Sequence, residues 1–212
     1  MAVNSVMAMN LKVNRKMKID FRQTPHYWIN LDEHVKNATE ITAQFDRLGF
    51  RHERVPGVKE SPYIVGCGKA HIAALARAIE VGIFPCCIYE DDATVSEHYK
   101  PEIEVPDGAD ALYLGISLAG QPRFTKVTDD VCRVVDMMSL HAVCYTSKKY
   151  AVAAKNKCEQ CVYKDNYPHD VGTAQILRWY NVYACNRPYF FQSDDRESQN
   201  KWQGYTDKIL YG

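Results

Sequence analysis

The chain has 212 residues, 46% of them hydrophobic and 25% charged, so it can bury the core of one α/β domain but not of two ordinary ones. Its 26 basic and 26 acidic side chains balance, whereas nucleic-acid binders usually carry a basic surplus. We therefore expect no nucleic-acid partner. One domain is expected over residues 1–212, alone or within a longer chain, with residues 1–23 as a solvated N-terminal arm that includes the basic run 12–18.

Targeting signals are lacking in the sequence. No run of about 18 apolar residues occurs, so no membrane span is expected. The first ten residues have neither the apolar core nor the preceding basic residue of a signal peptide. Eight cysteines without a secretory signal indicate reduced thiols and a cytoplasmic location. Cys158 and Cys161 form a lone C-x-x-C pair, and because no second pair stands at suitable spacing, a zinc site there is not favoured.

Apolar runs alternate with helical periodicity along the first half of the chain. Residues 26–31 predict a buried strand, and apolar residues at helical spacing over 35–48 predict a helix that ends at Gly49. A second strand over 50–55 stops at Pro56-Gly57. The next helix is expected to begin after Gly66-Cys67-Gly68 and to run to about residue 79. Strands over 85–89 and 111–114 follow.

The second half predicts a mixture of strands and helices. Strands are expected over 131–135, 141–145 and 182–185, and helices over 147–158, with Ser147 as the cap, and over 171–180. The order of the first half is that of a parallel sheet covered on both faces. We therefore predict an α/β fold with a central sheet, mixed but mostly parallel, flanked by helices.

In such sheets, ligands bind in the crevice beyond the carboxyl ends of the strands. The residues that follow the predicted strands are Asn30, Asp32, Arg54, Val55, Glu90, Asp91, Asp92 and the segment 115–117, which ends at Ser117. These residues are the first candidates for a binding site.

Three adjacent acids, Glu90, Asp91 and Asp92, follow the apolar strand 85–89. Adjacent carboxylates repel one another, and a hard divalent cation, which prefers oxygen ligands and often keeps phosphate oxygens, would relieve that repulsion. A metal that holds a diphosphate is one interpretation, and a solvated turn is the other. Spacing alone does not decide between them, but the buried strand favours the site because it fixes the acids at a sheet edge.

Two further segments carry a structural and a functional interpretation each. Lys69 and His71 follow the glycines at the expected helix start, where a phosphate could bind, although an ordinary helix start is favoured and the P-loop spacing is lacking. Asp170 precedes the helix expected over 171–180, where it could cap the helix or serve as a general base. From the residues alone we favour the cap.

The ordered motifs resemble glycosyltransferase family 25, the group that includes lipopolysaccharide and collagen galactosyltransferases. The matching segments are YWINLD at 27–32, RVPGV at 54–58, Gly66-Cys67 with His71, IYEDD at 88–92, DALYLG at 110–115, HAVCYTS at 141–147, Pro168 with Asp170, and Gln192 with Ser198. Each motif is weak alone, but eight in the correct order are specific. The chain departs from the family at Ala70, where a serine is usual, and at 57–59. Within the family it most resembles the N-terminal domain of a glycosyltransferase from large DNA viruses of algae.

The resemblance implies a GT-A fold and a metal-dependent, inverting transfer of a hexose from a nucleotide-sugar, a UDP-hexose, to a glycan or glycoprotein acceptor. It implies that Asp92 binds Mn²⁺ or Mg²⁺, and that Asp170 is the catalytic base. The donor-binding residues that it implies are Asn30, Asp32 and Arg54 near the nucleoside, Lys69 and His71 near the diphosphate or sugar, Glu90 and Asp91 at the ribose, sugar or metal-bound waters, Ser117 at the sugar, and also Val55.

Two other functions stay open. A nucleotidyltransferase also uses a metal and acids on an α/β sheet, but it usually needs a glycine-rich basic loop near its first strand, and Asn30-Leu31-Asp32 is not such a loop. A non-catalytic nucleotide-sugar or carbohydrate-binding module is the second alternative. Release of pyrophosphate would indicate the first, and donor binding without turnover the second.

Overall fold

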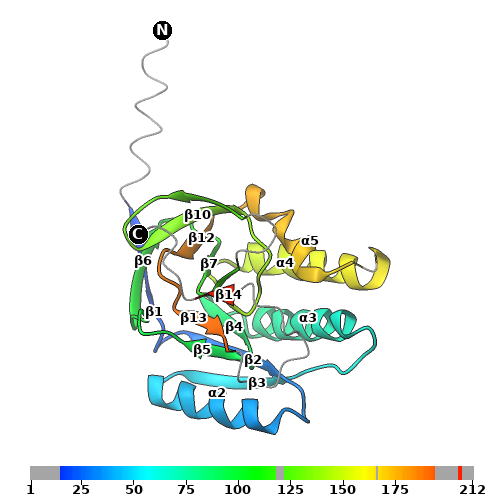
Figure 1. The fold of residues 1–212 in the computed structure, drawn as a ribbon. Coiled ribbons are helices and arrows are strands. Elements are labelled where there is room, and N and C mark those ends of the chain that lie inside the picture. The colour runs from blue at the N-terminus through cyan, green and yellow to red at the C-terminus, as the bar shows by residue number, and fades with distance from the viewer. Residues whose placement is uncertain (1–14, 118–121, 166, 194–204, 207–212) are drawn as a thin grey trace.

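An eight-stranded sheet forms the centre of the protein in the computed structural model, which describes residues 15–117, 122–165, 167–193 and 205–206 (Figure 1). Its strands, in spatial order, are β3 (Arg51–Pro56), β2 (Pro25–Asn30), β4 (Cys86–Glu90), β11 (Ala142–Tyr145), β7 (Ala111–Tyr113), β12 (Val182–Cys185), β10 (Val131–Asp136) and β9 (Arg123–Lys126). The strands predicted from the apolar runs are all members of this sheet.

The sheet is mixed, as predicted, but parallel pairing does not prevail. Three neighbouring pairs are parallel: β3 with β2, β2 with β4, and β7 with β12. The other four pairs are antiparallel. Strand β11 separates the two parallel groups because it runs antiparallel to both of its neighbours, β4 and β7.

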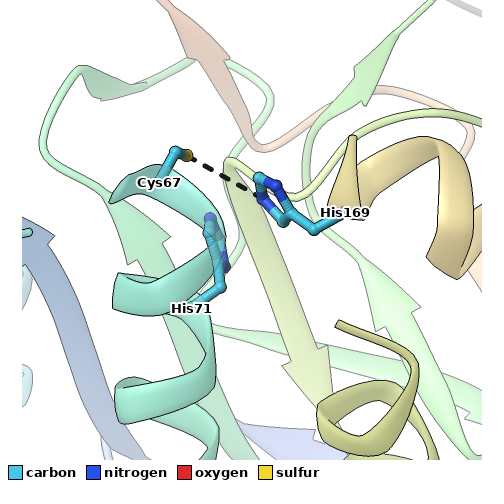
Figure 2. A group of neighbouring side chains, drawn as sticks. All are labelled: Cys67, His71 and His169. Atoms are coloured by element: carbon cyan, nitrogen blue, oxygen red, sulfur yellow. Dashed lines mark hydrogen bonds between the residues drawn. The ribbon is translucent and has the colours of Figure 1, made fainter. Parts of the chain in front are cut away.

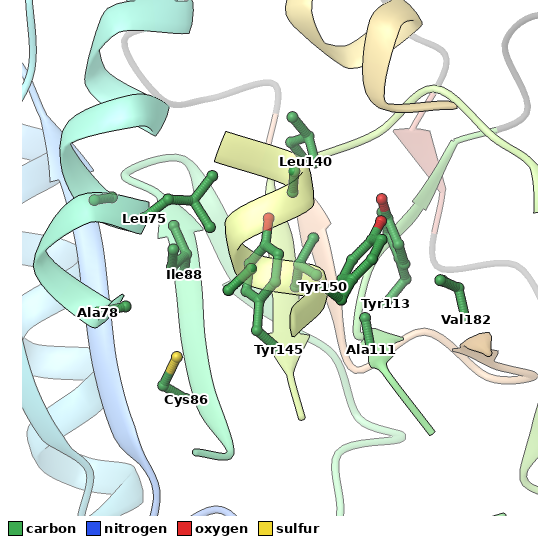
Figure 3. Packing of buried hydrophobic residues seen from close by; sticks show 14 of the residues in the cluster. Leu75, Ala78, Cys86, Ile88, Ala111, Tyr113, Leu140, Tyr145, Tyr150 and Val182 are labelled. Atoms are coloured by element: carbon green, nitrogen blue, oxygen red, sulfur yellow. The ribbon is translucent and has the colours of Figure 1, made fainter. Parts of the chain in front are cut away.

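Helices cover both faces of the sheet, so the predicted α/β class is confirmed. Successive side chains of a strand point to opposite faces, and in β4 Cys86 and Ile88 join one apolar cluster while Cys87 and Tyr89 join the other. Helices α3 (Tyr63–Val81) and α4 (Lys148–Gln160) pack on the first face, where Leu75 lies against this cluster (Figure 3). Helix α2 (Val35–Leu48) packs on the second.

The expected N-terminal arm is wrong for residues 16–23. Strand β1 (Lys16–Asp20) pairs with β6 (Glu102–Pro106), and Ile19 and Phe21 are fully buried. Apolar and charged residues alternate in β1, so that Lys16 and Lys18 reach Glu104 and Glu102 while Ile19 faces the core. Residues 1–14 lie outside the described part of the chain.

Helix α3 begins earlier than predicted, so residues 66–68 are not its start, neither as the ordinary helix start that was favoured nor as the alternative phosphate site. The helix starts at Tyr63 after Pro62, so that Gly66 and Gly68 lie inside it, and Lys69 and His71 lie in its second and third turns rather than at its free N–H groups. The glycines were interpreted as the segment before the helix, but Gly66 lies inside the helix and permits close packing. A Cβ on Gly66 would lie 2.1 Å from the carbonyl oxygen of Val58.

We expect Gly66→Ala to lower the free energy of unfolding by about 2–3 kcal/mol, because the added methyl meets backbone that cannot move aside. Gly68→Ala is the matched control in the same helix. Its methyl would lie 2.4 Å from Cγ2 of the half-buried Val162, a side-chain atom that can shift, and 3.4 Å from the His169 ring, which is ordinary contact, so the expected loss is below about 1 kcal/mol. Urea denaturation of both variants measures the difference, and equal losses would contradict this account of the helix packing.

In the second half of the chain, the helical segments are shorter and more interrupted than the periodicity predicts. Helix α4 has the predicted cap, because Ser147 Oγ accepts a hydrogen bond from the Tyr150 amide. The helix expected over 171–180 is instead the short α5 (His169–Ala174) and a separate 3₁₀ turn over Leu177–Trp179. A π-helical turn over Cys161–Asp165 follows α4.

Two small ribbons complete the described structure. They are β5 (Ala93–Val95) with β13 (Phe190–Gln192), and β8 (Ile116–Ser117) with β14 (Tyr205–Thr206). All eight cysteines are free thiols. Among the described residues, no helix combines the length and apolar character needed to cross a bilayer.

Candidate functional site

The carboxyl ends of β2, β3 and β4 meet at one edge of the sheet, as predicted from the strand order. Asn30 lies beside Pro56, and Ile29 lies beside Glu90 in the two parallel pairings. A cleft opens at this edge, with about 920 Å³ of empty space when the adjoining open solvent is included. Its polar lining includes Asn30, His34, Cys67, Glu90, Asp91, Asp92, His169, Asp170 and Gln192.

Asn30 connects two of the strand-end segments. Its side-chain amide donates hydrogen bonds to Asp91 Oδ2 at 2.7 Å and to the backbone oxygen of His34 at 3.0 Å. Its Oδ1 accepts a hydrogen bond of 2.9 Å from Arg54 Nε. The Arg54 guanidinium also pairs with Asp32, whose carboxylate is 88% exposed. These four predicted residues therefore lie together, with Asn30 and Asp91 on the cleft and the Arg54–Asp32 pair outside its lining.

The three adjacent acids do not share one set of contacts: Glu90 and Asp92 bind the same amide, and Asp91 has other partners. Gln192 Nε2 donates to Glu90 Oε2 at 2.9 Å and to Asp92 Oδ2 at 2.8 Å, so that one amide holds these two carboxyl groups together. Asp91 turns away from them toward Asn30 and lies 3.5 Å from His34 Nδ1. Asp92 is only 5% exposed. The pair suited to share a ligand is therefore Glu90 with Asp92.

Burial favours the neutral forms of Glu90 and of the histidine beside it. It raises the pKa of Glu90 to about 8, and the charges of Asp91 and Asp170 act in the same direction. Burial lowers the pKa of His71 to about 4, although Asp170 opposes this. His71 Nε2 lies 3.0 Å from Glu90 Oε1, and at neutral pH this contact is a hydrogen bond between uncharged groups rather than an ion pair.

The raised pKa of Glu90 predicts a loss of stability with rising pH in the metal-free protein. The unfolded chain releases this proton near pH 4.5, while the folded protein keeps it until about pH 8, so stability falls across that window by at most about 1.4 kcal/mol per pH unit. Glu90→Gln cannot ionise, and its stability relative to the wild type should rise from about pH 5 to about pH 8. Urea unfolding with a chelator, beside the exposed control Glu97→Gln, measures this difference, and a constant difference would contradict it.

Asp170 lines the cleft, and it does not cap its helix. The residue before α5 is Pro168, and Asp170 stands in the first turn, where its Oδ1 accepts a hydrogen bond of 2.8 Å from the Val171 amide. The interpretation of Asp170 as the N-cap is therefore wrong. Its carboxylate lies close enough to Glu90, Cys67 and Tyr63 to raise the pKa of each.

Besides Asp32 and Arg54, four predicted donor-binding residues are absent from the described lining of this cleft. Val55 is buried in the apolar cluster beneath α3. Lys69 Nζ pairs with Glu60 at 2.5 Å and lies 5.9 Å from the centre of the Tyr163 ring. Ser117 is fully buried in β8, next to β14. His71 is also buried, and it contacts Glu90 and His169, two residues that line the cleft.

Sequence reasoning assigned no role to several polar residues of the cleft. Gln192 entered only as part of a motif, and it reaches the acids because β13 pairs with β5, which puts Gln192 beside Ala93. No sequence pattern indicated a role for His34, because its place at the cleft depends on the turn that follows β2. For Cys67 a signal existed. Cys67 and His71 are four residues apart, a spacing that puts both side chains on one face of a helix.

Comparison with known proteins identifies no family. No family model matches the sequence, and no curated protein matches it. Among solved structures, the chain is similar to a nucleoside-diphosphate-sugar pyrophosphorylase from Vibrio cholerae RC9, with 13% identity and a TM-score of 0.45 over 77% of this chain and 73% of that one. A likeness of this size carries no argument about function. The resemblance to glycosyltransferase family 25 and its viral members therefore stays a prediction.

Proposed function

We propose that the protein is a metal-dependent glycosyltransferase of the GT-A type, which transfers a hexose from a UDP-sugar to a glycan or glycoprotein acceptor. One observation carries the proposal. Glu90 and Asp92, at the carboxyl end of a parallel strand, are held by one Gln192 amide in a cleft that Asp170 also lines. A divalent cation that holds a diphosphate and a general base each need carboxylates in such positions.

The acid pair fits a hard divalent cation that is shared with a substrate. Burial raises the pKa of Glu90 to about 8, and the charges of Asp91 and Asp170 act in the same direction, so a cation bound there would favour the ionised form of Glu90. Mg²⁺ is commonly bound through one or two carboxylates plus phosphate oxygens and water. Asp92 would hold Mn²⁺ or Mg²⁺, with Glu90 beside it. When bound, the cation supplies the positive charge that stabilises the departing diphosphate.

The protein's own residues orient the donor and the acceptor in this proposal. Asn30 fixes the Asp91 carboxylate at the cleft, where it can accept hydrogen bonds from ribose or sugar hydroxyls. Arg54 and Asp32, which pair outside the lining of the cleft, would lie near the nucleoside. The walls contributed by Ile29, Val58 and Tyr63 exclude water from the reacting groups.

Asp170 takes the proton in the proposed reaction. The sugar passes from the phosphate oxygen to an acceptor hydroxyl in one inverting displacement, with positive charge on the sugar ring in the transition state. As the new glycosidic bond forms and the bond to phosphate breaks, Asp170 removes the hydroxyl proton. The Val171 amide already holds one carboxylate oxygen of Asp170, which leaves the other to accept the proton.

The test is product analysis with UDP-hexoses and Mn²⁺, with and without a glycan acceptor. Formation of UDP, dependent on the metal and faster with an acceptor, supports the proposal. Release of pyrophosphate from UTP and a sugar 1-phosphate would instead identify a nucleotidyltransferase. Binding of UDP without turnover of any UDP-hexose would leave the alternative of a binding module.

A further inference from the structure

A second group of ligand-type side chains lies beside the acids. Cys67 and His71 stand four residues apart on one face of α3, and His169 reaches them from α5 (Figure 2). One potential ligand atom from each residue lies within 4.8 Å of the other two. The Cys67 Sγ lies 3.8 Å from His169 Nε2, and the two imidazole rings lie 4.9 Å apart.

The two histidines are buried with incompletely used nitrogens. His71 is 1% exposed and His169 is 3% exposed. The Nδ1 atom of each ring has no hydrogen-bond partner among the described residues. Burying a polar atom without a partner costs about 1–3 kcal/mol, so the unpartnered Nδ1 of His71 calls for a ligand, while His169 turns its Nε2 toward Cys67 Sγ.

We propose that Cys67, His71 and His169 bind a zinc ion, at a site separate from the acid pair. A thiolate and two imidazoles are the ligands that Zn²⁺ prefers, whereas Mg²⁺ and Mn²⁺ prefer oxygen. In a tetrahedral site with bonds of about 2.0–2.3 Å, the ligand atoms stand roughly 3.3–3.8 Å apart. The contact between Cys67 and His169 already meets this spacing, and small side-chain rotations bring in His71.

The surroundings of His71 fit such a site. Metal-binding histidines usually donate their other ring N–H to a carboxylate, which fixes the tautomer. Glu90 Oε1 stands 3.0 Å from His71 Nε2, so that Nδ1 is free to offer its electron pair to the ion. Cys67 and His169 also line the cleft, so the fourth position, held by water, opens toward it.

Binding is coupled to loss of one proton. Burial lowers the pKa of His71 to about 4 and of His169 to about 3, so both rings are neutral at pH 7 and lose no proton. Burial raises the pKa of Cys67, so its thiol keeps its proton until the ion arrives. As the sulfur–zinc bond forms, that proton passes to solvent. The ion would join α3 to α5 and so anchor the short helix that carries Asp170.

Cobalt spectroscopy of the full chain tests the site. The protein is stripped with a chelator and titrated with Co²⁺ without nucleotide, and one equivalent should produce a thiolate-to-cobalt charge-transfer band that Zn²⁺ abolishes. Cys67→Ala and His169→Gln should lose the band and weaken zinc binding at least about 100-fold, and Glu90→Gln should weaken it about 10-fold. Two variants should keep it: Cys158→Ala, which removes a buried thiol outside the cluster, and Asp92→Asn, which changes the acid pair.

The outcomes separate this site from the proposed function. Circular dichroism tests whether each variant is folded. If Cys67→Ala is not folded, His169→Gln alone serves as the test variant. No charge-transfer band in the wild type, or a band that survives in both Cys67→Ala and His169→Gln, overturns the zinc site. Failure of Mn²⁺-dependent UDP binding with an intact cobalt band would overturn the proposed function alone.

Discussion

Asp170→Asn is expected to lower turnover of a UDP-hexose by about 10²- to 10⁴-fold while leaving the affinity for UDP unchanged. Asparagine has the same shape as aspartate, and its Oδ1 can still accept the hydrogen bond from the Val171 amide. The fold of α5 should therefore be preserved. What the variant loses is an oxygen that can take a proton from the acceptor hydroxyl.

The control for this substitution is Asp165→Asn, which removes an exposed carboxylate outside the cleft, where it pairs with Gln160. Initial rates with saturating donor and calorimetric titration of UDP measure the two quantities. Near-normal turnover by Asp170→Asn would show that another group, or water, removes the proton. A large loss of UDP affinity would place Asp170 at the nucleotide instead.

Asp92→Asn is expected to abolish the contribution of Mn²⁺ to UDP binding, with a loss of affinity of at least about 100-fold, or about 2.8 kcal/mol. Residues that only support a metal ligand typically contribute 10- to 100-fold, and a direct ligand contributes more. The Gln192 amide now bonded to Asp92 Oδ2 can still bond to the asparagine oxygen, so the variant changes charge rather than packing.

Asp107→Asn is the matched control, because it removes an exposed carboxylate that does not line the cleft. Titrations of UDP with Mn²⁺ and with a chelator are compared for both variants. If Asp92→Asn binds UDP with wild-type affinity and keeps its dependence on Mn²⁺, the assignment of the metal to Asp92 is wrong.

Periodicity predicted the central elements of the fold, because those elements are long or wholly buried. Prediction from periodicity failed where a residue type is compatible with two different local structures. The lysines of β1 were taken for a solvated arm, although Met17 and Ile19 alternate with them and one face of the strand is buried. The glycines of α3 were taken for its start, although they lie inside the helix, where Gly66 allows Val58 to pack closely.

The residues of the candidate site could be predicted from the sequence where they directly follow parallel strands. Asn30, Glu90, Asp91 and Asp92 came from the rule that ligands bind beyond the carboxyl ends, and the register puts them side by side. The contact of Gln192 with two acids about 100 residues earlier depends on the pairing of β13 with β5, which leaves no local signal. For the same reason, the meeting of His169 with Cys67 could not be read from spacing.

Glu90 connects the two proposed metal sites. One of its oxygens shares the Gln192 amide with Asp92, and the other contacts His71. Its raised pKa means that a cation at either site would favour its ionised form. Glu90→Gln should therefore weaken both Mn²⁺-dependent UDP binding and zinc binding, whereas Asp92→Asn should affect only the first.

Calorimetric titration of UDP, first with Mn²⁺ and then with excess chelator, tests the central claim of a metal-dependent nucleotide-sugar site most directly, with CMP and GDP as controls. The account predicts binding of UDP that is lost when the chelator is added and is weaker for the other two nucleotides. Equal binding with the chelator, or no binding of any nucleotide by the folded protein with Mn²⁺ present, would contradict it.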